Sequence, residues 1–146
     1  MPPANVRIRT CLVEEAPKLL EFWKEAAAGE SATDDMRGVS VLFRTREDAV
    51  LLAEIDDEWV GCVIAAFDGW RGNIYRLGVS PAHRNQGIGR MLVREAERRL
   101  VAHGAKRLTA LAASHSPLAV PFWESMASDG WRPSHPAARY AKTVER

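Results

Sequence analysis

Residues 73–112 constrain the fold more than any other part of the chain. Strand-like apolar segments at residues 73–80 and 107–112 flank residues 87–103, whose apolar side chains recur at helical spacing. Pro81 ends the first segment because proline cannot donate to a strand ladder, and Gly104 stands where a left-handed residue commonly ends a helix. This order predicts a helix that crosses over between two strands of one sheet.

The rest of the chain adds strands and helices on both sides of this unit. Further strands are expected at residues 6–9, 49–55, 58–67, 131–132 and 138–144. Helices are expected at residues 14–28, after Thr33-Asp34-Asp35, and after Ser116-Pro117 with a late start or a kink at Pro121. Gly78 inside its strand suggests a bulge or a close backbone approach. The pattern is that of an α+β protein.

Composition bounds the class of protein. A length of 146 residues favours one domain, residues 1–146, and two cysteines are too few for a disulfide framework, which fits a reducing cytoplasm. No signal peptide, membrane span or metal site is expected. Residues 1–73 carry 14 acidic and 8 basic side chains, whereas residues 74–146 carry 5 and 12. The second half either faces a polyanion or simply has charged surface, and the overall excess is too small to suggest a nucleic acid partner.

The loop between strand and helix, residues 84–89, is the most informative motif. Gly87 and Gly89 let the backbone bend and approach a ligand closely. The first amides of a helix are unpaired and carry the positive end of its dipole, and Arg84 and Arg90 add charge. The loop therefore predicts a cradle for a pyrophosphate. It matches neither the Rossmann fingerprint nor the P-loop.

In its full context the segment resembles the GNAT superfamily of acetyl-CoA-dependent N-acetyltransferases. The motif R-x-x-G-x-G follows L-x-V-x-P, residues 116–124 resemble the family segment N-x-x-A-x-x-F/L-Y-E, and Gly130-Trp131 resembles its Gly-Phe. The resemblance implies a mixed, mostly antiparallel sheet of six to seven strands, splayed between the fourth and fifth, with about four helices packed on it. It also implies acetyl-CoA as co-substrate.

The resemblance assigns the cofactor site residue by residue. Backbone groups of Leu77 and Val79 would pair with the pantetheine arm, and an amide near Gly78 and Val79 would stabilise the oxyanion. Ser116 takes the place of a family asparagine. The full set of implied cofactor contacts is Leu77, Gly78, Val79, Arg84, Asn85, Gln86, Gly87, Ile88, Gly89, Arg90 and Ser116.

The usual catalytic side chains of the family are absent. Trp123 stands at the position of the tyrosine acid, and Asn73 and Leu111 stand at the two positions where members carry a glutamate base. An indole has no useful acidity. No catalytic residue is therefore assigned. Since a thiolate leaves readily near neutral pH, and a water chain could deprotonate the amine, direct attack remains feasible.

Substitute bases and the acceptor pocket stay open. The candidate bases are Glu30, Asp34, Asp35, Glu54, Asp68, His115 and Tyr140, each of which could equally be a surface or capping residue. The candidate acceptor pocket comprises Trp23, Glu30, Asp34, Trp123 and Tyr140, although both tryptophans could belong to the core. Cys62 fits a small core residue better than an acetyl-carrying nucleophile.

The leading hypothesis is an N-acetyltransferase that lets a primary amine attack the bound thioester in a ternary complex. The acceptor could be a small molecule or a peptide, and the acidic first half favours a cationic one. The alternative is a non-catalytic acyl-CoA-binding or sensing domain. A third possibility, acetylation of aminoacyl-tRNA, would require a basic acceptor face, which the acidic first half disfavours. Neither a nucleic acid nor a membrane partner is expected, and the protein would be a monomer or homodimer.

Overall fold

The computed structural model describes residues 3–26, 33–112, 116–134 and 137–144. The chain forms two compact units, Met1–Leu111 and Ala112–Arg146, and each is described by itself. The expectation of a single domain stays a prediction. Among the described helices, none is long and apolar enough to cross a membrane.

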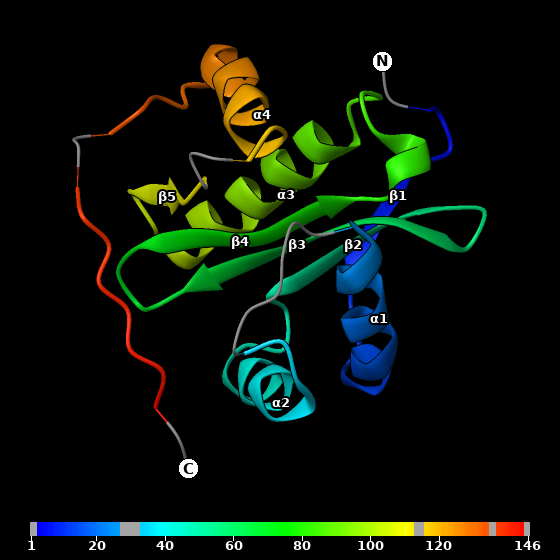
Figure 1. The fold of residues 1–146 in the computed structure, drawn as a ribbon, viewed down its shortest axis with the longest axis horizontal. Coiled ribbons are helices and arrows are strands. Elements are labelled where there is room, and N and C mark those ends of the chain that lie inside the picture. The colour runs from blue at the N-terminus through cyan, green and yellow to red at the C-terminus, as the bar shows by residue number, and fades with distance from the viewer. Residues whose placement is uncertain (1–2, 27–32, 113–115, 135–136, 145–146) are drawn as a thin grey trace. The chain divides into compact units, whose positions relative to one another are not determined.

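The first unit is built on a sheet whose strands lie in chain order (Figure 1). The described strands are β1 (Arg7–Thr10), β2 (Val50–Ile55), β3 (Glu58–Phe67), β4 (Gly72–Val79) and β5 (Leu108–Ala110). Neighbours from β1 to β4 pair antiparallel, and β5 pairs parallel to β4. The parallel pair follows from the predicted helix crossover, which returns the chain to the same end of the sheet.

Helices cover both faces of this sheet (Figure 1). The helices α1 (Ala16–Ala26) and α2 (Met36–Thr45) lie on one face, and α3 (Ile88–His103) lies on the other. Asp35 begins α2 as predicted, because its carboxylate accepts a hydrogen bond of 2.7 Å from the Gly38 amide. Gly104, at φ 110°, ends α3.

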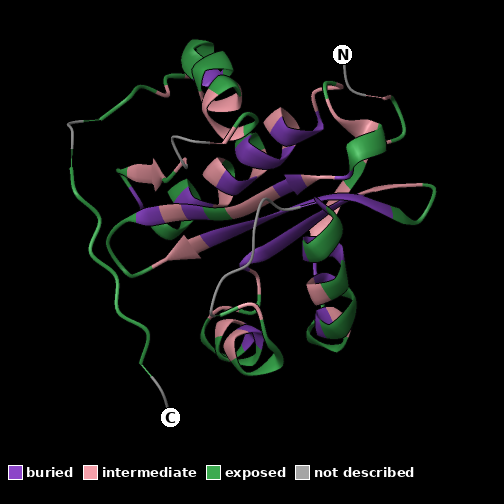
Figure 2. Cartoon of the chain, in the orientation of Figure 1, coloured by how far each residue is buried: buried purple, intermediate pink, exposed green. Residues whose placement is uncertain are grey.

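The core explains why β3 is apolar along most of its length. Its residues from Trp59 to Ala65 are all buried (Figure 2). Cys62 and Ile64 pack with the buried faces of α1 and α2. On the other face α3 lies close to Gly61, where a Cβ atom would come within 2.9 Å of a Leu92 methyl carbon. With both faces covered, a ligand of this unit can reach the sheet only at an edge or an end of a strand.

The sheet splays between β4 and β5, as expected. The pairing of β4 with β5 covers only Gly72 to Ile74, whereas β4 continues to Val79. On the β5 side, the stretch from Tyr75 to Val79 therefore has no strand partner among the described residues. This leaves an open edge on β4, between the fourth strand and the outermost strand of the sheet.

The second unit departs from the expectation at its C-terminal part. It contains α4 (Ala119–Ser125) and a 3₁₀ turn (Met126–Asp129), and α4 starts late, as predicted from Pro121. The expected strands at residues 131–132 and 138–144 do not form: the described residues there are neither helix nor strand. The prediction of six to seven strands was therefore wrong, since five form among the described residues. A segment in which polar and apolar residues alternate forms a strand only where another strand offers an unpaired edge. Tyr140, in the second of these segments, is 93% exposed.

Candidate active site

The open edge of β4 presents backbone groups that a ligand can pair with. The Ser80 amide donates to the Val60 carbonyl of β3 at 2.8 Å. Because successive residues of a strand direct their N–H and C=O groups to opposite sides, Leu77 and Val79 direct theirs to the open side. These are the two residues that the sequence resemblance assigned to the pantetheine arm, and their role stays a prediction.

The loop that follows β4 leads directly into a helix N-terminus. A 3₁₀ turn (Pro81–His83) is followed by Asn85 and Gly87 in left-handed conformations, with φ 63° and 83°, and α3 begins at Ile88. The first helical amides have no partner inside the helix, and the helix dipole is positive there. The unpaired amides at the start of α3 fit a pyrophosphate group of a ligand. The open edge of β4 fits an extended part of the same ligand that carries amide groups.

Arg84 ties the loop to its surroundings. Its Nε donates to the Val79 carbonyl at 3.1 Å, and one of its Nη atoms donates to the Ala26 carbonyl at 3.4 Å. The sequence suggested Arg84 mainly as added charge for a phosphate. The structure adds a structural role, because one side chain joins the end of α1, the end of β4 and the loop. A guanidinium has five donor hydrogens, so these bonds do not exhaust it.

Gly78 and its neighbour Arg76 account for the irregularity expected in β4. A Cβ atom on Gly78 would lie 3.2 Å from the carbonyl carbon and oxygen of Ala26, so the predicted close backbone approach is confirmed. The pairing with β3 shifts between Cys62 and Ile64, which leaves one extra residue on β4. Arg76 lies in this bulge with φ 53°. The bulge thus lies two residues before Gly78.

The structure brings together two of the five residues suggested for the acceptor pocket. Asp34 forms an ion pair with Arg76, and the Arg76 guanidinium lies over the ring of buried Trp23, 5.6 Å from its centre. Glu30 lies outside the described residues. Trp123 and Tyr140 belong to the second unit.

In the second unit, aromatic packing and capping account for the residues the sequence singled out. Trp123 packs against Trp131 and Phe122, with ring centres 4.7 and 5.2 Å apart. Ser116 Oγ accepts hydrogen bonds from the Leu118 and Ala119 amides at 3.3 and 3.1 Å, which caps the start of α4. Its proposed contact with a cofactor stays a prediction.

Several candidate bases have structural partners. Glu54 accepts from Arg9 at 2.9 Å, Asp35 caps α2, and His115 lies outside the described residues. Asp68 accepts from the Trp70 and Arg71 amides at 2.8 and 2.7 Å. These backbone bonds, led by the one from Arg71, lower the pKa of Asp68, so this carboxylate closes a turn.

The residues at family catalytic positions and the buried thiol also have clear environments. Asn73 Oδ1 accepts from the Thr109 hydroxyl at 2.6 Å, and Leu111 is 67% exposed beyond the end of β5. Burial raises the pKa of Cys62 to about 12, and its Sγ donates to the Arg76 carbonyl at 3.5 Å. Cys62 is therefore a core residue, as the sequence suggested, because nucleophilic attack needs the thiolate.

Sequence reasoning missed Arg76, although a signal was present. Residues 74–79 read Ile-Tyr-Arg-Leu-Gly-Val, so a charged side chain stands inside an otherwise apolar strand. A charge in such a strand needs a partner or a route to solvent. That requirement could have directed attention to Arg76 and to the acidic pair Asp34 and Asp35.

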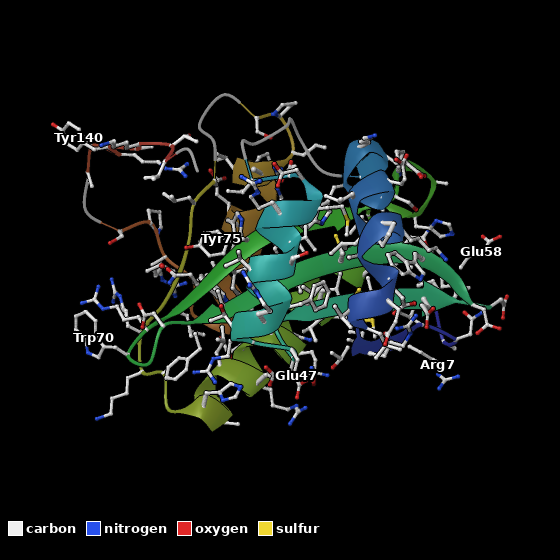
Figure 3. All side chains as sticks on the ribbon, turned by 90° about the horizontal axis from the view of Figure 1, so that it is seen from below. Arg7, Glu47, Glu58, Trp70, Tyr75 and Tyr140 are labelled. Atoms are coloured by element: carbon white, nitrogen blue, oxygen red, sulfur yellow. The ribbon has the colours of Figure 1, made fainter. Side chains whose placement is uncertain are left out.

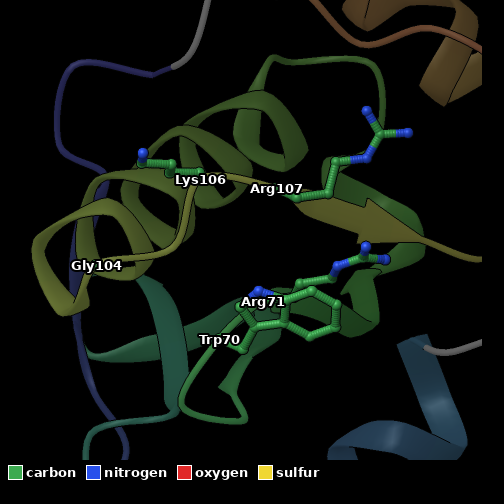
Figure 4. A pocket seen from close by; sticks show the side chains of 5 residues that line it. All are labelled: Trp70, Arg71, Gly104, Lys106 and Arg107. Carbon is green, nitrogen blue, oxygen red and sulfur yellow. The ribbon is translucent and has the colours of Figure 1, made fainter.

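A shallow hollow of about 410 Å³ lies at the other end of β4 (Figure 4). It is lined by Trp70, Arg71, Gly104, Lys106 and Arg107. Trp70 stands out from the hairpin between β3 and β4, whereas Tyr75 lies further along β4 (Figure 3). Since β4 runs from Gly72 to Val79, the hollow and the loop lie at opposite ends of one strand, roughly 23 Å apart at the rise of an extended chain.

Comparison with known proteins supports the fold. A model of the acetyltransferase (GNAT) family matches residues 12–127. The acetyltransferase ECA0875 of Pectobacterium atrosepticum is 33% identical over 121 residues, which cover 83% of this chain and 86% of that protein. A predicted acetyltransferase of Clostridium acetobutylicum, solved with acetyl-CoA, has a TM-score of 0.72 at 13% identity and covers 93% of this chain and 96% of its own. An aminoglycoside acetyltransferase, meta-AAC0020 from an uncultured soil sample, has a TM-score of 0.70 at 17% identity, with 97% of both chains covered.

Proposed function

This chain belongs to the acetyltransferase (GNAT) family and is an acyltransferase, and from this premise we propose that it transfers the acetyl group of acetyl-CoA to a primary amine. The proposal rests on one observation: the open edge of β4 leads directly into the loop and helix N-terminus that form the pyrophosphate cradle. From Tyr75 to Val79, β4 has no described strand on its β5 side, and the chain then runs directly into the N-terminus of α3. A ligand with an amide-rich arm and a pyrophosphate matches both features at once.

The proposed reaction is a direct attack in a ternary complex. The lone pair of a neutral amine forms a C–N bond to the thioester carbonyl carbon, and the C–S bond then breaks to release the CoA thiolate. The Val79 amide, which faces the open side, would donate to the oxyanion of the tetrahedral intermediate, a type of interaction worth about 3 kcal/mol. The proton lost by the amine would pass to water or to a carboxylate at the acceptor side.

The proposed acceptor is a small cationic amine. One similar fold belongs to a protein named as an aminoglycoside acetyltransferase, which favours a small molecule with amino groups. Glu25 is exposed on α1, next to the end of the helix that approaches Gly78, whereas Glu21 on the same helix is paired with Lys24. The charge of Glu25 would favour a cationic amine. Asp34 contributes less to this attraction than the sequence suggested, because Arg76 compensates its charge.

Calorimetry and a turnover assay test the proposal together. Acetyl-CoA should bind the isolated protein, and a panel of polyamines, aminoglycosides, lysine peptides and neutral amines should contain acceptors that release CoA. Binding without turnover of any amine would favour the alternative of an acyl-CoA-sensing domain. No binding at all would contradict the assignment of the open edge and loop.

A further inference from the structure

Three basic side chains surround the hollow at the Gly72 end of β4 (Figure 4). Arg71 belongs to the hairpin between β3 and β4, whereas Lys106 and Arg107 belong to the turn between α3 and β5. All three residues are exposed. Within the part of the chain that the structure describes, neither Lys106 nor Arg107 forms an ion pair. The hollow therefore has basic groups that a ligand from solution can reach.

Negative charge near the hollow offsets only part of this positive charge. Asp68 lies in the same hairpin, where its carboxylate accepts hydrogen bonds from the Trp70 and Arg71 amides. The C-terminus of α3 adds about half a negative charge, which acts within the last turn of the helix. Together they compensate about half of the charge of the three basic side chains. The hollow thus favours an anionic ligand.

Trp70 gives the hollow an aromatic surface. The residue is 70% exposed, and the Arg71 guanidinium lies 4.1 Å from the centre of its ring. The guanidinium covers one face of the indole, so the large exposed fraction indicates that the other face meets solvent. An accessible aromatic face stacks well on the flat ring of a nucleobase.

The backbone holds the two lining segments in a fixed arrangement. The Gly72 amide donates to the Arg107 carbonyl at 3.0 Å, and β4 pairs with β5 from Gly72 to Ile74. Gly104 has φ 110°, and no atom of a distant residue lies within 4 Å of the place where its Cβ would be. A rigid backbone lowers the cost of ordering a site when a ligand binds. The volume of about 410 Å³ lies within the usual range of small-molecule sites.

We propose that this hollow binds a nucleoside polyphosphate. The base stacks on Trp70, and the basic side chains bind the phosphate groups, since the planar fork of a guanidinium can form two parallel hydrogen bonds to a phosphate. In Figure 4 the side chains of Arg71 and Arg107 extend in the same direction. The site is separate from the acetyl-CoA cradle, because the two lie at opposite ends of β4, roughly 23 Å apart at the rise of an extended strand.

Calorimetric titration with ATP, adenosine and inorganic tripolyphosphate tests the proposal. Because acetyl-CoA contains an adenine nucleotide, ATP could also enter the cradle, so all titrations use a chain that carries Gly87→Asp. ATP should bind more tightly than either of the other two probes. Adding Trp70→Ala should lower ATP affinity roughly tenfold, since one stacked base is lost, and should leave tripolyphosphate affinity unchanged. Adding Arg107→Gln should lower both affinities roughly tenfold.

A matched control removes a positive charge elsewhere. Arg7 is exposed on β1, at the opposite edge of the sheet from β5, and lies far from Trp70 (Figure 3). Arg7→Gln should leave ATP affinity within about twofold, because surface charges at this distance are screened. Trp70→Ala and Arg107→Gln replace exposed side chains and should keep Tm within about 2 °C. In the chain with Gly87 intact, both should leave acetyl-CoA affinity unchanged.

Lower ATP affinity in both hollow variants, with the control unchanged, supports the proposal. Equal affinity for ATP and tripolyphosphate, with no effect of Trp70→Ala, would reduce the hollow to a patch that attracts any polyanion and would overturn it. Tighter binding of a hexaglutamate peptide than of ATP would favour an acidic protein partner and would also overturn it. So would the absence of ATP binding at millimolar concentration, or binding that neither hollow variant weakens.

Discussion

The two ends of β4 are built in opposite ways. At the Gly72 end the strand is paired on both sides, to Phe67 of β3 and to Leu108 of β5. The hairpin before it is closed by Asp68, and a Cβ on Gly72 would lie within 2.7 Å of a Leu108 methyl carbon and 2.9 Å of a Leu100 methyl carbon. This closed end has little room for change and supports the scaffold.

At the Val79 end the strand is paired on one side only. Arg76, Asn85 and Gly87 adopt left-handed conformations within twelve residues, and the first amides of α3 have no helical partner. Strained residues and unpaired backbone groups cost stability, and proteins concentrate them at binding sites. The comparison teaches that one strand can serve as scaffold at one end and as ligand platform at the other.

The largest expected effect comes from a charge placed at the open end. Gly87→Asp puts a carboxylate at the start of α3, where the phosphates are proposed to bind, and should weaken acetyl-CoA binding by more than about 100-fold. The matched control is Gly69→Asp in the hairpin, which also has a left-handed glycine, with φ 95° and no atom near a Cβ. Calorimetry should show unchanged affinity for the control. Equal losses in both variants would remove the distinction between the two ends.

A methyl group should have different consequences at the two ends. Gly78→Ala brings a Cβ to 3.2 Å from the backbone of Ala26, so the end of α1 must shift, and kcat/KM should fall roughly tenfold. Gly72→Ala crowds Leu100 and Leu108 and should cost about 1–3 kcal/mol of unfolding free energy without changing acetyl-CoA affinity. Denaturant unfolding and steady-state kinetics measure the two effects. A lower affinity of Gly72→Ala for acetyl-CoA would contradict the division of β4 into a scaffold end and a ligand-binding end.

A smaller effect is expected at Trp123. If backbone groups of the open edge carry the reaction and no side-chain acid is needed, Trp123→Phe should change kcat by less than about threefold, because an indole donates no useful proton. Trp123→Tyr, which supplies a phenol, should raise kcat or leave it unchanged. A large loss of kcat with Phe at unchanged acetyl-CoA affinity would show that the indole takes part in the chemistry.

The smallest effect concerns the scaffold at the far edge of the sheet. Hydrogen bonds from Arg9, at 2.7 Å, lower the pKa of Glu15 to about 2 from its ordinary 4.5. The unfolded chain therefore binds a proton first as pH falls, so the stabilisation is full above pH 4.5 and is lost towards pH 2. After solvent screening it amounts to about 1 kcal/mol. From pH 4.5 to about pH 2 the unfolding free energy of the unmodified protein should fall by about 1 kcal/mol more than that of Glu15→Gln. The two proteins should have equal affinity for acetyl-CoA at neutral pH.

Local patterns predicted the closed end and much of the open end. Helical spacing and the glycines at 87 and 104 marked α3 to within a residue, and the break at Pro81 marked the end of β4. The bulge could not be assigned to Arg76, because its position depends on the register between β3 and β4, and the apolar run of β3 fits more than one register. The strands expected at residues 131–132 and 138–144 were wrong for a related reason: alternation shows which side chains could face a core, but not whether a strand edge is available.

Amide hydrogen exchange with and without saturating acetyl-CoA tests the central claim most directly. If the open end of β4 and the start of α3 bind the co-substrate, the amides of Leu77, Val79 and residues 87–90 should exchange roughly tenfold more slowly when it is present. The amides of the hairpin at residues 68–72 should exchange at the same rate with and without it. Protection confined to the hairpin, or no protection in the loop at ligand saturation, would contradict the account.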